Sequence, residues 1–192
     1  MNLSLEEKAL ILAYNAHKGQ MRKYKVEPYI VHPIYVAEIL REITQDEKLI
    51  AVALLHDTLE DTGLSFAEIK AFCGKEVADM VLLLTNEKIG DTREERNNNY
   101  IEKLLQAPKE IIDIKLLDIS HNLQNFETMV EADKKFADIY FEEKKLFFNK
   151  LGSKANNLTC EILSTMITVI NAKKLRAEKE FERRRRNSKI NN

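Results

Sequence analysis

Histidine and acidic residues gather in three short clusters, and their side chains have the chemistry of metal ligands. The clusters are His32 before Pro33, His56-Asp57 with Glu60-Asp61, and Asp118 with His121-Asn122. Imidazole and carboxylate groups together suit a first-row divalent cation such as manganese, iron or zinc. An acidic pair outside the ligand set can activate water or protonate a leaving group. The pattern therefore predicts the metal site of a phosphohydrolase.

The second cluster is predicted to lie on a helix that continues the apolar stretch before it. Residues four apart share a helix face, so His56 lies above Glu60, and Asp57 lies above Asp61. Successive residues are about 100° apart around the axis, which lets His56 and Asp57 converge on one ion over the groove between them. Glu60 and Asp61 then remain free beside that ion.

The other two ligands are expected from distant parts of the chain. Pro33 imposes extended backbone on His32 and can aim its imidazole inward from the end of a helix. Asp118 lies between isoleucine and leucine residues and should be buried. An ionised carboxylate there costs on the order of several kcal/mol unless a cation or another partner compensates it. A lone His-Asp pair at a helix end is often only a cap, but the three clusters together are more specific.

The composition predicts one all-α domain that carries these residues. The 192 residues include only 5 glycines and 3 prolines, too few for the turns of a many-stranded sheet. We expect residues 1–152 to form the catalytic core and residues 153–192 a C-terminal helix that packs on it, with a basic, frayed end. Capping boxes are expected at Ser4-Glu7 and Ser65-Glu68, and residues 86–99 should form a flexible loop.

Charge and cysteine content narrow the function classes. The chain has 30 basic and 31 acidic residues, so no net field favours nucleic acid or a membrane surface. The Arg183–Arg186 run follows Glu178, Glu180 and Glu182 and is predicted to be a solvated helix end. Cys73 and Cys160 should be reduced thiols of a cytoplasmic protein.

No apolar run approaches about 18 residues, so neither a membrane span nor a secretion signal is expected. The apolar helix faces are compatible with a homo-oligomer, but none is distinctive enough to predict one.

Four motifs, in this order, resemble the HD-domain hydrolases of the RelA/SpoT-type alarmone enzymes. They are His17-Lys18-Gly19-Gln20-Met21-Arg22-Lys23, Pro28-Tyr29-Ile30-Val31-His32-Pro33, the segment 54–62, and Lys115-Leu116-Leu117-Asp118 with His121-Asn122. The resemblance covers residues 5–126 and implies a single HD-domain helical bundle. The implied ligands of one Mn²⁺ are His32, His56, Asp57 and Asp118. Glu60 and Asp61 are implied to serve the hydrolytic step.

The same resemblance implies a substrate, guanosine 3′,5′-bis(diphosphate) or its pentaphosphate relative. The products would be GDP or GTP and pyrophosphate. Arg22 and Lys23 match the family's basic pair, in which the guanidinium can stack on guanine and the ammonium can meet phosphate. Asn122 would hydrogen-bond the nucleoside, and Asn125 falls where the family also contacts the ligand. Lys88 would reach the distal phosphates.

Departures from the family pattern leave base selectivity open. Ile119-Ser120 follow Asp118 where a basic residue is usual, and residues 24–27 lack the usual glycine. Two other functions therefore stay open: an HD-domain phosphatase for another nucleotide such as NADPH, and a non-catalytic nucleotide sensor. The chain is too short for the synthetase domain of long members, so it resembles the stand-alone small alarmone hydrolases. His17 and His121 are expected to support the site without ligating the metal.

Overall fold

The computed structural model of the chain describes the backbone of residues 3–190, and their side chains except those of Glu178 and residues 180–190. Residues 3–190 form helices and no strand, which confirms the expected all-α fold; the one β-type contact is an isolated bridge between Met21 and Pro28. The elements are α1 (Leu5–Ala16), α2 (Val31–Arg41), α3 (Glu47–Leu55), α4 (Thr58–Asp61), α5 (Phe66–Cys73), α6 (Lys75–Leu84), α7 (Arg93–Leu105), α8 (Lys109–Leu123), α9 (Phe126–Leu151), a 3₁₀ turn (Gly152–Lys154) and α10 (Asn157–Ile190).

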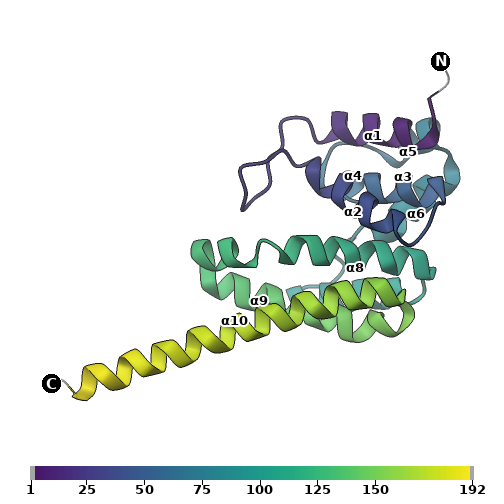
Figure 1. Ribbon diagram of the computed structural model, residues 1–192. Coiled ribbons are helices and arrows are strands. Elements are labelled where there is room, and N and C mark those ends of the chain that lie inside the picture. Colours follow the sequence, from purple (N-terminus) through teal and green to yellow (C-terminus); the bar gives the residue numbers. More distant parts are fainter. Residues whose placement is uncertain (1–2, 191–192) are drawn as a thin grey trace.

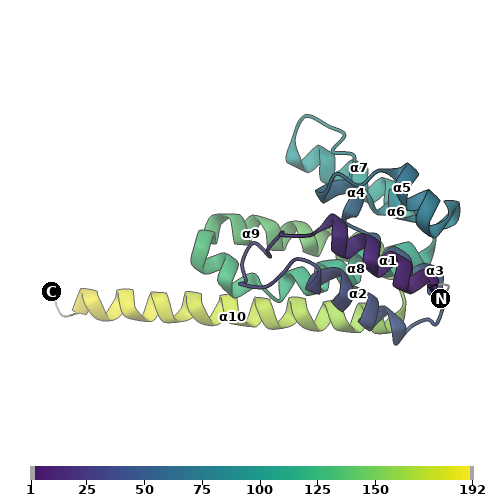
Figure 2. The same cartoon turned by 90° about the horizontal axis from the view of Figure 1, so that it is seen from above.

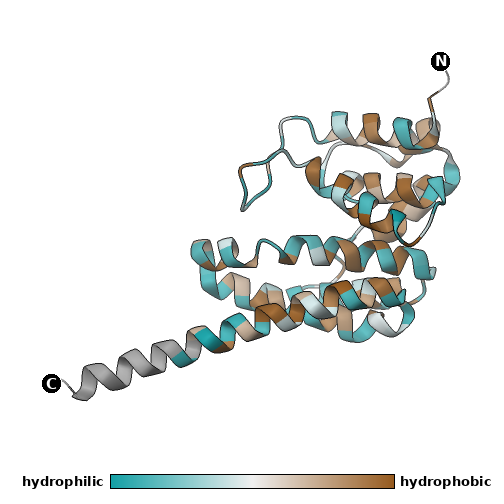
Figure 3. Cartoon of the chain, viewed as in Figure 1, coloured by the Kyte–Doolittle hydropathy of each residue, from teal (hydrophilic) through white to brown (hydrophobic). Residues whose placement is uncertain are grey.

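The helices lie in two groups, with α1 to α6 above α8 to α10 in the view of Figure 1. Helix α3 packs against α1, α2 and α6, and each of its residues from Leu49 to Leu55 is buried. Figure 3 shows this helix as a mostly hydrophobic segment. Helix α8 packs against both α2 and α10 and so joins the two groups. The two helices α3 and α8, in which most residues are buried, lead to or carry three of the four candidate metal ligands.

Local capping explains where several helices begin. Both expected capping boxes are present: the Ser4 hydroxyl accepts from the Glu7 N–H, and the Ser65 hydroxyl accepts from the Glu68 N–H. Asp46 caps α3 by accepting from the N–H of Lys48 at 2.8 Å. These side chains satisfy backbone donors that the first helical turn leaves free. The positions at which α1, α3 and α5 begin are therefore encoded locally.

The prediction of a flexible loop over residues 86–99 was wrong for the second half of that segment. Helix α7 begins at Arg93, and Asn97, Asn98 and Asn99 lie inside it. The N-cap of α7 is Thr92, whose hydroxyl accepts from the Glu95 N–H while the Glu95 carboxylate accepts from the Thr92 N–H. This third capping box outweighs the weak helix propensity of three asparagines. The irregular segment is therefore confined to residues 85–92.

Helices α9 and α10 complete the second group. Helix α9 bends at Asp133, which has φ −157° and ψ 95°, and the Asp133 carboxylate restarts the helix by accepting from the Phe136 N–H. Helix α10 packs on α8 and α9, and its C-terminal part extends past the rest of the fold (Figure 2). The Arg183–Arg186 run falls among the side chains outside the described set. Within residues 3–190, no helix has the length and apolar character needed to cross a bilayer.

Candidate metal centre

His56 and Asp57 lie at a break between two helices, which corrects the prediction of one continuous helix. Helix α3 ends at Leu55, and α4 starts at Thr58. Two side chains take up carbonyls of the last turn of α3: His56 Nδ1 lies 2.8 Å from the Ala53 carbonyl, and the Thr58 hydroxyl donates to the Leu55 carbonyl at 2.7 Å. Such bonds compete with the helical pattern. The break places His56 and Asp57 at the end of the buried helix α3.

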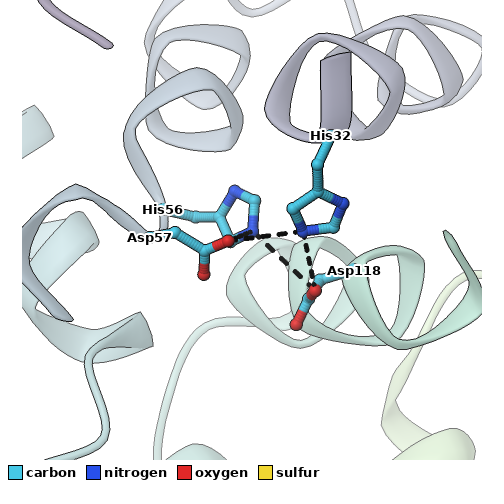
Figure 4. Close-up of side chains that lie close together, drawn as sticks. All are labelled: His32, His56, Asp57 and Asp118. Atoms are coloured by element: carbon cyan, nitrogen blue, oxygen red, sulfur yellow. Dashed lines mark ion pairs between the residues drawn. The ribbon is translucent and has the colours of Figure 1, made fainter. Parts of the chain in front are cut away.

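Two other elements, α2 and α8, bring the remaining two ligands to the same point (Figure 4). His32 comes from the first turn of α2 and Asp118 from the middle of α8. The expectation of extended backbone at His32 was wrong, because α2 already begins at Val31 and Pro33 lies within its first turn. The Nε2 atom of His32 lies 3.0 Å from Asp118 Oδ1 and 3.3 Å from Asp57 Oδ2. The Nε2 atom of His56 lies 3.0 Å from Asp57 Oδ2 and 3.9 Å from Asp118 Oδ1. One ligand atom from each residue lies within 4.8 Å of the other three.

The donor set fits a divalent cation. The Nε2 atoms of both histidines are buried, and among the described residues they form no hydrogen bond of ordinary geometry, although carboxylate oxygens lie 3.0 Å away. A carbonyl can only accept, so His56 Nδ1 carries a proton toward Ala53, and in the neutral ring Nε2 offers a bare lone pair. Two imidazole nitrogens and two carboxylate oxygens suit a borderline first-row ion. The protein's His/Asp cluster is thus compatible with a divalent metal.

The electrostatics of the cluster also favour a cation. Despite their burial, the pKa values of Asp57 and Asp118 are held well below the usual range, by His56 for Asp57 and by Lys115 for Asp118. Both carboxylates are therefore ionised at neutral pH. Burial alone would lower the pKa of His56, but the two carboxylates outweigh it and raise the value to about 10. A proton on this ring occupies the position that a cation would take.

His121 supports His32 from the side opposite the cluster. The two Nδ1 atoms are 2.7 Å apart, and the His121 ring stacks on Tyr35 with centroids 4.1 Å apart. Burial and the charge of His32 lower the pKa of His121 to about 3, so this ring is neutral at neutral pH and can accept a hydrogen bond from the His32 Nδ1–H. That bond leaves the Nε2 lone pair of His32 available to a metal ion. His121 therefore contacts the candidate ligand His32 and is not one of the four clustered residues.

Asp118 has two protein partners of its own. The Lys115 ammonium donates to Oδ2 at 2.7 Å, and the Asn122 amide donates to Oδ1 at 2.5 Å. Arg22, which is 7% exposed, donates in turn to the Asn122 side-chain oxygen at 2.9 Å. The compensating partner expected for Asp118 is thus partly Lys115, to which the sequence analysis gave no role. A lysine one turn before a buried aspartate was the available signal.

The acidic pair lies beside the cluster. Glu60 accepts from the Asn86 N–H at 3.1 Å, and Asp61 accepts from the Tyr29 hydroxyl at 3.2 Å. Tyr29 also donates to Asp57 Oδ2 at 2.6 Å, so it links the acidic pair to a candidate ligand. Burial raises the pKa of Glu60 and of Asp61. Both carboxyl groups can then exchange protons more readily near neutral pH.

The other residues with an expected role in substrate binding differ in their exposure. Lys88 is exposed and lies 3.9 Å from Glu60, with a positive φ of 55°. Lys23 is exposed and its ammonium lies 5.1 Å from the centroid of the Phe136 ring on α9. Asn125 is buried, and its side-chain oxygen has no partner. Arg22 and Asn122 lie next to the four candidate metal ligands, whereas the Lys23 side chain lies near Phe136, close to the bend in α9.

His17 lies outside the ligand set, as expected. Its Nδ1 atom is 2.8 Å from Gln20 Oε1, and its ring stacks on Tyr29 with centroids 4.6 Å apart. Gln20 donates through Nε2 to the Asp61 carbonyl at 3.0 Å. His17 therefore supports the Tyr29 ring and, through Gln20, the backbone of Asp61.

The sequence of residues 9–155 matches that of the HD domain family. The chain belongs to the HD domain family. This match includes every candidate ligand and both members of the acidic pair. It agrees with the resemblance seen in the four motifs.

Named relatives of this HD domain include alarmone enzymes. A Synechocystis protein named as a probable guanosine-3′,5′-bis(diphosphate) 3′-pyrophosphohydrolase is 36% identical over 76% of the chain and 20% of its own length. An Aquifex aeolicus protein with the same enzyme name is 42% identical over 76% of the chain and 21% of its own length. The bifunctional (p)ppGpp synthase/hydrolase SpoT of Escherichia coli is 36% identical over 63% of the chain and 18% of its own length. The chain thus spans about a fifth of these curated relatives.

Solved structures similar to this HD domain match most of its length. A structure described as a metazoan ortholog of SpoT that hydrolyses ppGpp aligns with a TM-score of 0.78 and 28% identity, over 88% of this chain and 96% of the other. A Listeria monocytogenes protein, lmo0812, aligns with a TM-score of 0.62 and 28% identity, over 76% of this chain and 99% of the other. The helical arrangement around the site is therefore found in experimental structures.

Proposed function

We propose that this HD domain is a metal-dependent hydrolase that removes pyrophosphate from the 3′ position of guanosine 3′,5′-bis(diphosphate) or its pentaphosphate relative, giving GDP or GTP. The observation that carries the proposal is the convergence of two histidine nitrogens and two aspartate oxygens within 4.8 Å. The acidic pair Glu60 and Asp61, which is outside this ligand set, lies beside them. The names of the sequence relatives and of the metazoan structural neighbour support the choice of substrate.

The proposed ligands of one divalent ion, taken to be Mn²⁺, are His32, His56, Asp57 and Asp118. When bound, such an ion would lower the pKa of a water molecule and neutralise negative charge that develops on the phosphoryl oxygens. The protein's part is to hold the four ligand atoms in place before the ion arrives. His121 fixes the orientation of His32, and Tyr29 does the same for Asp57. Residues held in this way lose little freedom on binding.

Glu60 and Asp61 are proposed to move protons during hydrolysis. Both carboxyl groups have raised pKa values because they are partly buried. One can accept a proton from the attacking water, and the other can orient that water. The Tyr29 hydroxyl keeps its proton because burial and Asp57 raise its pKa, so it serves as a donor to Asp57 and Asp61.

The remaining residues are proposed to bind the nucleotide. Arg22 and Asn122 would contact the guanosine, as the family resemblance implies, and their hydrogen-bonded chain to Asp118 places them beside the proposed metal site. The buried, unpartnered oxygen of Asn125 supports a role as a hydrogen-bond acceptor for the ligand. Lys23 and Lys88 are exposed cations suited to the phosphates.

A small anionic nucleotide is the proposed partner, and the proposed location is the cytoplasm. The formal net charge of −1 supports a small ligand over a nucleic acid. Cys73 and Cys160 are free in the structure, in keeping with a reducing compartment.

The proposal is tested by a hydrolysis panel. Purified protein is loaded with Mn²⁺ and incubated with guanosine tetraphosphate, guanosine pentaphosphate, GTP and NADPH, and the released pyrophosphate and orthophosphate are measured separately. We expect the tetraphosphate to give pyrophosphate and GDP, with a kcat/KM at least about tenfold above the values for GTP and NADPH. Faster phosphate release from NADPH would show that the substrate is a different nucleotide and not the alarmone. Nucleotide binding without turnover by the metal-loaded protein would indicate a sensor.

A further inference from the structure

Lys115 is a buried cation bound to one of the candidate metal ligands. Its side chain is 14% exposed, and its ammonium donates to Asp118 Oδ2 at 2.7 Å. The Tyr100 ring lies beside it, with its centroid 5.4 Å from the ammonium. Tyr100 uses its own hydroxyl to donate to the Leu84 carbonyl. Among the described side chains, the Asp118 carboxylate is the one that forms an ion pair with Lys115, and the more distant carboxylates of Asp57 and Glu60 also interact with its charge.

The two oxygens of Asp118 have different surroundings. Oδ1 faces the cluster, 3.0 Å from His32 Nε2. Oδ2 is engaged by Lys115 on the other side of the carboxylate. A carboxylate can bind a cation through one oxygen or through both. An oxygen already bonded to an ammonium is a poor second ligand, because the two cations would repel each other across it.

We propose that Lys115 is a positioning residue that restricts Asp118 to one ligand oxygen and so keeps a coordination position open for water or substrate. This inference rests on the proposed metal centre and deepens it. With one atom from each of the four protein ligands, a six-coordinate ion would keep two positions open. A second oxygen from Asp118 would fill one of them.

Lys115 also carries a positive charge close to the cation site. The repulsion between this charge and a divalent ion weakens metal binding. The same charge stabilises the negative charge that accumulates on a phosphoryl group during hydrolysis. Lys115 therefore lowers the affinity for the metal while it favours turnover. A lysine that only supported the fold would not have opposite effects on these two quantities.

The test is metal binding by Lys115→Met, compared with the wild-type chain by competition with a coloured chelator for Mn²⁺ and Co²⁺. We expect the variant to bind both ions about tenfold or more tightly, because a like charge is removed and a ligand oxygen is released. The visible absorption spectrum of bound Co²⁺ should change, as the coordination number of the ion changes. The kcat of the variant should fall. Lys109→Met removes an exposed lysine from the same helix and should leave all three quantities unchanged.

Two further variants keep the test decisive if Lys115→Met does not fold. Lys115→Gln retains a hydrogen-bond donor without the charge and should also bind the metal more tightly. Lys115→Arg retains the charge and should keep an affinity and a Co²⁺ spectrum close to those of the wild type. Weaker or unchanged binding, with an unchanged spectrum, in both uncharged variants would overturn the inference. Failure of the wild-type chain itself to bind either ion would instead overturn the proposed metal centre.

Discussion

The Asn122 amide donates to Asp118 Oδ1 at 2.5 Å, and this is the same oxygen that faces His32 and His56. Asn122 lies one helical turn after Asp118 on α8, so the bond is local and well defined. The other end of the amide accepts from Arg22. One asparagine therefore connects a proposed nucleotide-binding arginine to a proposed metal ligand.

Replacing Asn122 should weaken metal binding. In Asn122→Ala, Asp118 Oδ1 loses its donor and is free to turn away from the cluster. Residues that orient a ligand in this way typically contribute 10-fold to 100-fold in affinity, and we expect a loss of about that size in the Mn²⁺ affinity measured by calorimetry. Gln106→Ala, which removes an exposed amide at the end of α7, is the matched control and should bind as the wild type does. Equal affinities for the two variants would show that the bond to Asp118 has no role in metal binding.

The acidic pair should be dispensable for metal binding and necessary for hydrolysis. Glu60→Gln and Asp61→Asn remove the proton acceptors but preserve the shape of each side chain. General acid-base catalysis contributes about 10²-fold to 10⁴-fold, so kcat should fall by about that factor in each variant, with the Mn²⁺ affinity within a few-fold of wild type. Glu87→Gln, which alters an exposed acid paired with Lys103, serves as control. Retained turnover in both variants would remove this pair from the mechanism.

Metal binding should strengthen as the pH rises. The carboxylates of Asp57 and Asp118 outweigh the effect of burial and raise the pKa of His56 to about 10 in the metal-free protein. Below that pH, a cation must displace the proton on His56, so affinity should rise about tenfold per pH unit between pH 6 and 9. The aspartates stay ionised throughout because their pKa values lie well below the usual range. Calorimetry in buffers of different ionisation enthalpy should detect about one released proton per ion; an affinity that did not change with pH would contradict this.

Much of the fold could be predicted from local signals. The boxes at Ser4 and Ser65, and the cap at Asp46, are side-chain to backbone bonds within three residues, so the sequence contains both partners. Helix α7 was missed in part because three asparagines outweighed the Thr92-Glu95 pair in that prediction. The bend at Asp133 had no strong local signal, because the residues on both sides of it favour a helix.

The sequence allowed the residues of the candidate site to be predicted, but not the hydrogen bonds and contacts that hold them in place. The four ligand residues were indicated by their types and by their order along the chain. The break after Leu55 depends on bonds from His56 and Thr58 to the last turn of α3, and a periodic pattern does not reveal such bonds. Contacts between distant segments, such as His32 with His121 and Tyr29 with Asp57, depend on how the helices pack. Packing of this kind is not encoded in spacing along one segment.

The most direct test of the metal centre is a crystal structure of the Mn²⁺-loaded chain with anomalous diffraction data collected at the manganese edge. We predict one anomalous peak per chain, about 2.0–2.3 Å from the Nε2 atoms of His32 and His56 and from one oxygen each of Asp57 and Asp118. Asp118 should bind through Oδ1 alone. A peak at another group of residues, or no peak in a protein that hydrolyses the alarmone, would contradict the account.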